Sequence, residues 1–280
     1  GRLAGVLGEC KSLTHLDFSG NFVGRSGGET RSAGLVECKS LAHLNLSNNN
    51  IWGKEVGKLP GVFGVAHLDL RCNSFGAEGT QMLAMVLEKY KVLMHLDLLS
   101  CQIGSQGAGI LWGVLEKCRA LAHLDLGNNK RGGQGARRLT KTLDKCKTLA
   151  HLNLSHSEII NEGAESLAEV LEKCTALARL ELCTNRIRGQ GAKTLAGGLQ
   201  KCKGLVYLDL SDNNIGDTGA AVLAEAARDC IWINTREAEV RKRRTRRTKR
   251  MRRTGTMGRT RRMGRSEGQG GQERRGGGGG

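Results

Sequence analysis

The stretch LAHLDLGNN, from Leu121 to Asn129, decides the fold of this chain, because close copies of it recur along the sequence. Its leucines alternate with His123 and Asp125, which is the side-chain period of a short strand buried on one face. The final Asn129 carries an amide that suits hydrogen bonds to the backbone of a turn. The block is therefore predicted to be a short strand followed by a turn.

Seven further copies surround this block, which makes eight repeats. Successive copies start 28 residues apart, except for one step of 24 residues between the second and third copies. Self-similarity at such a period is typical of repeat architectures. The copies are LTHLDFSGN at 13–21, LAHLNLSNN at 41–49, VAHLDLRCN at 65–73, LMHLDLLSC at 93–101, LAHLNLSHS at 149–157, LARLELCTN at 177–185 and LVYLDLSDN at 205–213.

The segments between the copies have the pattern of helices. In GSQGAGILWGVLEKC, from Gly104 to Cys118, the apolar residues Leu111, Val114 and Leu115 recur at helical spacing, and Gly107 is assigned to the preceding turn. Each unit is then strand, turn, helix, turn. Parallel strands lie about 4.8 Å apart, whereas packed helices need about 8–10 Å. A stack of such units must bend, with its strands on the concave side.

The pattern LxxLxLxxNxI followed by GxxGAxxLAxxL resembles the ribonuclease-inhibitor-type leucine-rich repeat. That repeat is found in ribonuclease inhibitor, in the GTPase-activating proteins of the Ran system and in the sensor region of NOD-like receptors. The resemblance covers about residues 1–233 and implies an α/β solenoid, or horseshoe, of about eight 28-residue repeats. Parallel strands are expected on its concave face and helices on its convex face. An aromatic content of 3% and a single proline fit such a thin, repetitive core.

Two domains are predicted. Residues 1–233 form the leucine-rich-repeat domain, which we expect to be N-terminally truncated because Gly1 enters part-way through a repeat. Residues 234–280 form a basic, Gly-rich tail that holds most of the net charge of +17 and is expected to be disordered. Its run RKRRTRRTKRMRR, at 241–253, favours non-specific, salt-sensitive association with nucleic acid, or nuclear import. The alternative interpretation, sequence read out of frame, stays open.

Three departures from the repeat carry structural expectations. The second repeat lacks four residues and contains Pro60, so its helix is expected to be short or distorted. Cys101 and Ser157 replace the turn asparagine in two repeats, which is expected to loosen those turns. A ninth repeat starts near residue 230, with Ile233 at the first apolar position of its strand, and fails at Arg236, where a core leucine is due.

Cysteines recur three residues before the first apolar position of the strands. Valine and tyrosine take this place in two repeats, which indicates a buried packing site. Disulfides or metal ligation are the alternative, but cysteines one repeat apart are expected to exceed disulfide reach. Free buried thiols favour a reducing compartment, so the cytoplasm is expected, or the nucleus if the tail directs import. The cysteines are Cys10, Cys38, Cys118, Cys146, Cys174, Cys202 and Cys230.

Two polar rows are predicted on the concave face. The histidine row comprises His15, His43, His67, His95, His123 and His151, and it is continued by Arg179 and Tyr207. The carboxylate row, two residues further along each strand, comprises Asp17, Asn45, Asp69, Asp97, Asp125, Asn153, Glu181 and Asp209. One interpretation is a ladder that binds metal or an anion, or senses pH. The favoured one is duplication of a solvent-facing pair, because a regular array lacks the convergent geometry of a metal site. No metal site is predicted.

Partner binding is assigned to the concave face, with anchors where the uniform rows break. Binding hot spots favour Tyr and Arg, so Arg179, Glu181 and Tyr207 are the predicted anchors. The full predicted set is His95, Asp97, His123, Asp125, His151, Asn153, Arg179, Glu181, Tyr207 and Asp209.

No catalytic signature accompanies the repeats: the sequence has no phosphate loop, HExxH, nucleophile elbow or zinc-ribbon spacing. The predicted function is therefore a non-enzymatic protein-binding scaffold or sensor module, without cofactor, membrane span or small-molecule substrate. Two alternatives stay open. One is regulation of a small GTPase, which the resemblance implies, and the other is nucleic-acid association through the tail.

Overall fold

The computed structural model describes residues 9–22, 38–59, 64–129, 145–228 and 232–235. The predictions that concern Pro60, Cys230 and the tail from residue 236 onward lie outside these ranges. Within them, no helix is long and apolar enough to cross a membrane.

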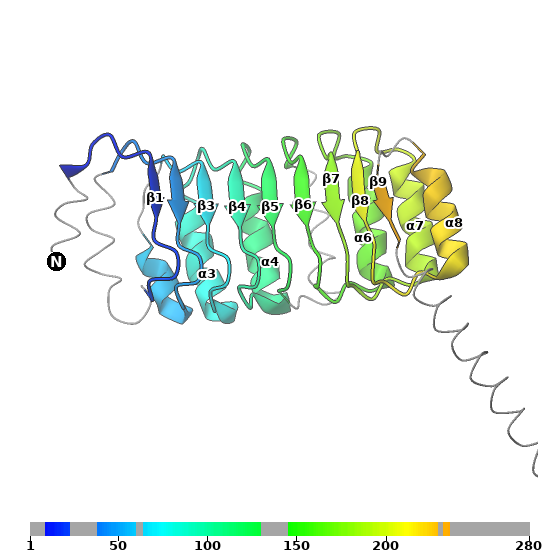
Figure 1. The fold of residues 1–280 in the computed structure, drawn as a ribbon, viewed down its shortest axis with the longest axis horizontal. Helices are drawn as coiled ribbons and strands as arrows, with labels where there is room; N and C mark the ends of the chain where they lie inside the picture. Colours follow the sequence, from blue (N-terminus) through cyan, green and yellow to red (C-terminus); the bar gives the residue numbers. More distant parts are fainter. Residues whose placement is uncertain (1–8, 23–37, 60–63, 130–144, 229–231, 236–280) are drawn as a thin grey trace, which may run out of the picture. The chain divides into compact units, whose positions relative to one another are not determined.

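Nine three-residue strands form one parallel sheet in the order of the sequence (Figure 1). Each strand pairs with the next so that equivalent repeat positions face one another, as in His95↔His123 and Asp97↔Asp125. The strands are β1 (His15–Asp17), β2 (His43–Asn45), β3 (His67–Asp69), β4 (His95–Asp97), β5 (His123–Asp125), β6 (His151–Asn153), β7 (Arg179–Glu181), β8 (Tyr207–Asp209) and β9 (Trp232–Asn234).

The helices lie together on one side of this sheet (Figure 1). Neighbouring helices pack along the stack: η2 on α3, α3 on α4, α6 on α7 and α7 on α8. The predicted α/β leucine-rich-repeat solenoid is confirmed. The helices are α3 (Gly76–Leu87), α4 (Gly104–Leu115), α6 (Asn161–Leu171), α7 (Gly189–Leu199) and α8 (Gly216–Ala226), and η2 (Gly53–Lys58) is a 3-10 helix. The short helix expected in the second repeat is thus confirmed.

A narrow apolar core separates the strands from the helices. The middle residue of the strands from β2 to β8 is a fully buried leucine, and each helix from α3 to α8 buries leucine against it. Larger side chains are few; Tyr90 and Trp112 are both buried. The cysteines at the predicted packing sites Cys38, Cys118 and Cys146 are buried as well, which confirms their role as small apolar residues.

Buried asparagines join each turn to the repeat before it. Asn129 donates from Nδ2 to the carbonyl of Leu98 at 2.7 Å, and its Oδ1 accepts from the backbone N–H groups of Cys101 and Ile103 at 2.9 and 3.2 Å. Cys101, in the same position one repeat earlier, keeps only part of this role. Its thiol donates to the carbonyl of Leu70 at 3.1 Å, but it has no amide oxygen. The loosening expected for this turn is therefore limited to the hydrogen bonds that an asparagine oxygen would accept.

Two sequence predictions are corrected. Gly107 lies within α4 and not in the turn. A glycine is needed there because a Cβ would stand 2.9 Å from both Ile103 Cγ2 and Thr80 Oγ1. Ile233 lies opposite Leu208 in the middle of β9 and is not the first apolar position of the strand. The chain re-enters the sheet three residues earlier than a 28-residue period requires, which shifts the register of the ninth unit.

Candidate functional site

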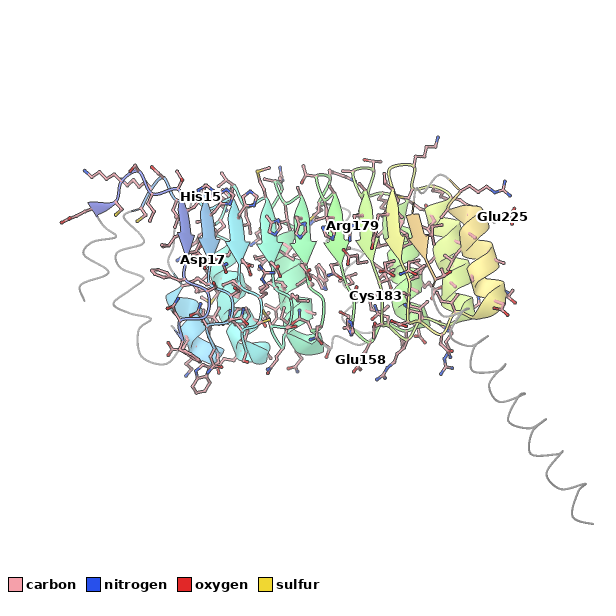
Figure 2. All side chains as sticks on the ribbon, in the orientation of Figure 1. His15, Asp17, Glu158, Arg179, Cys183 and Glu225 are labelled. Carbon is pink, nitrogen blue, oxygen red and sulfur yellow. The ribbon has the colours of Figure 1, made fainter. Side chains whose placement is uncertain are left out.

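The face of the sheet opposite the helices, here called the open face, carries both predicted rows. On the strands from β2 to β8 the middle leucine is buried, whereas the flanking row residues are partly exposed, apart from the buried Asp97. Figure 2 labels the first members of the two rows, His15 and Asp17, on β1, and labels Arg179 on β7. The alternation of the sequence therefore places the two rows side by side along the stack.

The histidines of the row stack on one another. In-register parallel strands bring equivalent residues to about 4.8 Å. Ring centroids are 4.0 Å apart for His15 and His43, 4.1 Å for His43 and His67, 5.5 Å for His67 and His95, and 3.8 Å for His95 and His123. His151 ends the stack, since its ring stands edge-on to His123 at 4.0 Å.

Burial favours the uncharged form of three histidines of the row. Burial, reinforced by neighbouring imidazoles, lowers the pKa of His43 and of His95. Burial, and then the neighbouring imidazoles of His151 and His95, lower the pKa of His123 to about 3. A neutral imidazole both donates and accepts a hydrogen bond, so this part of the open face is polar without being cationic.

The carboxylate row has a structural role that its spacing alone does not show. Except at Glu181, the Oδ1 atom of each row residue accepts a hydrogen bond from the backbone N–H two residues later, at 2.7 to 3.1 Å. Such a bond closes an Asx turn and ends the strand. Asp and Asn both provide this oxygen, which explains why Asn45 and Asn153 replace aspartate in the row without altering the turn.

Asp97 is the most buried carboxylate of the row, at 9% relative exposure. Burial is the largest cause that raises its pKa, to about 6, and the like charges of Asp125 and Asp69 add to it. Arg71 opposes the shift: its guanidinium lies 2.6 Å from Asp69 Oδ2 and 3.9 Å from Asp97 Oδ2. The sequence prediction missed Arg71. Arg71 lies two residues after Asp69, at a position that is occupied by small residues in other repeats, such as Ser19, Ser47 and Gly127.

The three predicted anchors contact one another. Glu181 Oε1 lies 2.7 Å from Arg179 Nε and 3.0 Å from His151 Nε2. The hydrogen bond from His151 and then the pairing with Arg179 hold the pKa of Glu181 at about 2, against the opposing effect of burial. The guanidinium of Arg179 also lies over the Tyr207 ring. His151, Glu181, Arg179 and Tyr207 are thus linked to one another by side-chain contacts.

A depression of about 390 Å³ lies at the other end of the open face, over β1 to β4. Polar side chains of both rows line it: His15, Asp17, His43, Asn45, His67, Asp69 and His95. Of the predicted partner-binding residues, only His95 borders it. The remaining ones follow along β4 to β8, where the structure aligns them in their two rows. Across the described ranges, no group of three or more metal-ligating side chains converges.

Comparison with known families identifies the repeats. One leucine-rich-repeat model matches residues 9–30, 65–84, 145–168 and 201–224, and a second leucine-rich-repeat model matches residues 40–66. The chain contains leucine-rich repeats. No curated protein matches this leucine-rich-repeat chain.

Solved structures resemble part of the leucine-rich-repeat chain. Leiomodin-1 actin-binding site 2 is 15% identical with a TM-score of 0.40, covering 51% of this chain and 95% of its own. The tropomodulin C-terminal domain of Caenorhabditis elegans is 18% identical with a TM-score of 0.41, covering 51% of this chain and 96% of its own.

Proposed function

We propose that this chain is a non-catalytic protein-binding module, a scaffold or sensor, that holds its partner on the open face. The observation that carries the proposal is the form of this face: strands in register present two continuous polar rows, while helices cover the opposite side of the sheet. Leucine-rich repeats are generally binding modules, and the surface of such a stack is long enough to contact an extended partner. The ribonuclease-inhibitor type of repeat, including its use in GTPase regulation, remains part of this proposal.

The open face also has the chemical make-up of a binding surface. A row of imidazoles lies beside a row of carboxylates and amides, and the residues just before the histidine row are mostly alanines, so little bulk covers the rows. Met94 and Val206 interrupt this series and are 48% and 43% exposed. Partly exposed apolar side chains beside polar rows are common features of interfaces. We also propose a reducing compartment, the cytoplasm, which the buried thiols of Cys38 and Cys118 support.

Site-specific photocrosslinking tests the proposal. A photoreactive residue at Ala122, beside the histidine row, is expected to crosslink a specific protein in an extract of the source cells. The same residue at Glu165, which is exposed on α6, is the matched control on the opposite side. A partner that crosslinks from Glu165 and not from Ala122 would show that the helices, and not the open face, form the binding surface.

A further inference from the structure

We propose that the part of the open face over β1 to β5 binds an arginine-rich segment of a partner protein. This inference rests on the proposed function and adds the chemistry of the partner. The segment would lie across the strands, with its guanidinium groups along the carboxylate row and its aliphatic stems over the histidine row. The site includes the depression over β1 to β4 and extends to Asp125 on β5.

Charge is the first support. Four carboxylates face this part of the sheet, at Asp17, Asp69, Asp97 and Asp125. Within the described ranges, Arg71 is the cation that pairs with the row there, and it is shared between Asp69 and Asp97. His43, His95 and His123 do not offset this charge at neutral pH, because burial lowers their pKa values. The excess negative charge on this part of the sheet thus lies along the carboxylate row.

The second support is how the chain's own arginines sit on the same face. Arg71 bridges carboxylates of adjacent strands, at 2.6 Å from Asp69 and 3.9 Å from Asp97. Arg179, which continues the histidine row, donates to Glu181 at 2.7 Å and lies over the Tyr207 ring, with Cζ 3.6 Å from the ring centroid. The rows therefore already accommodate guanidinium groups in two different geometries, one between carboxylates and one between a carboxylate and a ring.

The shape of the surface is the third support. The depression, about 390 Å³, falls within the range of ligand pockets, about 300–1,000 Å³. Small residues precede the histidines of two of its strands, at Ala42 and Ala66. Exposed cations also occur on this part of the molecule, at Lys39, Lys91 and Arg119, but they precede the strands, at the end away from the carboxylate row. A cationic segment along the carboxylate row would therefore avoid them.

Arginine suits this surface better than lysine does. Its guanidinium is planar and carries five donors, so it can bond carboxylates of two neighbouring strands at once and still lie against a ring. An ammonium is a strongly hydrated point charge that makes no such planar contact. Asp69, Asp97 and Asp125 lie on consecutive strands, so neighbouring carboxylates among them are about 4.8 Å apart.

The experiment measures binding of a fluorescent octa-arginine peptide to the full chain by anisotropy at low ionic strength. Asp69→Asn with Asp125→Asn removes two charges and keeps the Asx turns, as Asn45 and Asn153 already do. Glu165→Gln with Glu169→Gln removes two charges from the exposed side of α6. We expect saturable binding that the first pair of substitutions weakens about tenfold and the second less than about twofold. Octa-lysine is expected to bind about fivefold more weakly than octa-arginine.

Equal weakening by both pairs of substitutions, or the absence of saturable binding, would overturn the inference. So would equal affinity for octa-lysine. These outcomes leave the proposed function intact, because the crosslinking from Ala122 does not depend on the charge of the partner. Conversely, a partner that crosslinks only from the helical side would remove the proposed function, whatever the peptide does.

Discussion

Arg179 holds its guanidinium carbon 3.6 Å from the centre of the Tyr207 ring, one strand further along the sheet. The two residues occupy the positions of the histidine row on β7 and β8, where they face each other in register. Beyond His151, where the histidine stack ends, the row therefore has a cation–π contact in place of stacked imidazoles. Glu181 holds the guanidinium in this position, with its Oε1 2.7 Å from Arg179 Nε.

This contact is expected to give a measurable coupling energy. In a double-mutant cycle with Arg179→Ala and Tyr207→Leu, followed by urea unfolding, the two substitutions should be coupled by about 0.5–1 kcal/mol, the usual strength of a partly exposed cation–π pair. The combination of Arg71→Ala with Tyr207→Leu is the control, since Arg71 lies at β3 and is expected to show no coupling. Strictly additive effects of Arg179→Ala and Tyr207→Leu would contradict the pairing.

The histidine row is expected to make the folded chain sensitive to mild acid. His123 has a pKa of about 3 in the folded chain and about 6.5 when unfolded. Between these values the unfolded state binds more protons, so the free energy of unfolding falls as the pH falls below about 6.5. His123→Asn should therefore lose less stability between pH 7 and pH 5 than the parent chain does, as chemical denaturation at each pH would show.

His156→Asn is the control for that experiment. His156 is exposed outside the row, and its left-handed backbone, with φ at 53°, is one that asparagine tolerates. Its pH dependence should match that of the parent chain. An identical slope for all three proteins would show that His123 is protonated as easily in the folded chain as in the unfolded one.

Asp97→Asn is expected to stabilise the chain at neutral pH. The folded-state pKa of Asp97, about 6, lies above its unfolded value of about 3.9, so ionisation costs stability as the pH rises through 4 to 6. Asparagine removes this cost and keeps the acceptor for the Leu99 N–H. The gain should be on the order of 1 kcal/mol at pH 7.5, after allowance for solvent screening, and should vanish near pH 4.

Asp17→Asn provides the comparison for Asp97→Asn, because it makes the same change in the same row at an exposed position. The hydrogen bonds from Ser19 lower the pKa of Asp17, so its ionised form is favoured in the folded state. This substitution should therefore give no gain at pH 7.5. A gain of similar size from both substitutions would mean that burial of Asp97 is not the cause.

Two glycines of α4 should respond in opposite ways to alanine. A Cβ at residue 107 would stand 2.9 Å from Ile103 Cγ2 and from Thr80 Oγ1, so Gly107→Ala is expected to destabilise the chain by about 1–3 kcal/mol. At Gly113 no atom lies within 4 Å of an added Cβ, and Gly113→Ala should stabilise by about 0.4–1 kcal/mol. Thermal unfolding of both variants measures the contrast, and a Gly107→Ala variant as stable as the parent chain would contradict the close approach of α3 and α4.

The repeat period was sufficient to predict the fold and both polar rows, because strands in register convert a sequence repeat directly into rows in space. It did not reveal the turn-closing role of the carboxylate row. Asp and Asn both provide the oxygen that accepts the turn's hydrogen bond, but because they differ in charge the sequence does not show that they share this role. Contacts between rows were also missed. Arg71 bridges the carboxylates of two strands and Glu181 contacts both His151 and Arg179, and such pairings depend on rotamers. Gly107 was predicted to lie in a turn because the sequence does not distinguish a glycine that allows two helices to approach closely from one that allows a turn.

The asparagine contacts give the stack a direction. Asn129 satisfies two N–H groups of the preceding repeat, so the turn of one unit is completed by the unit that follows it. Duplication or removal of whole 28-residue units that carry this asparagine keeps such donors matched to acceptors, whereas a junction that alters the 28-residue spacing leaves polar groups without partners in the core. Genes for this kind of chain can therefore change length by unequal exchange at one phase of the period, and the span of the open face can be adjusted to its partner without any new residue type.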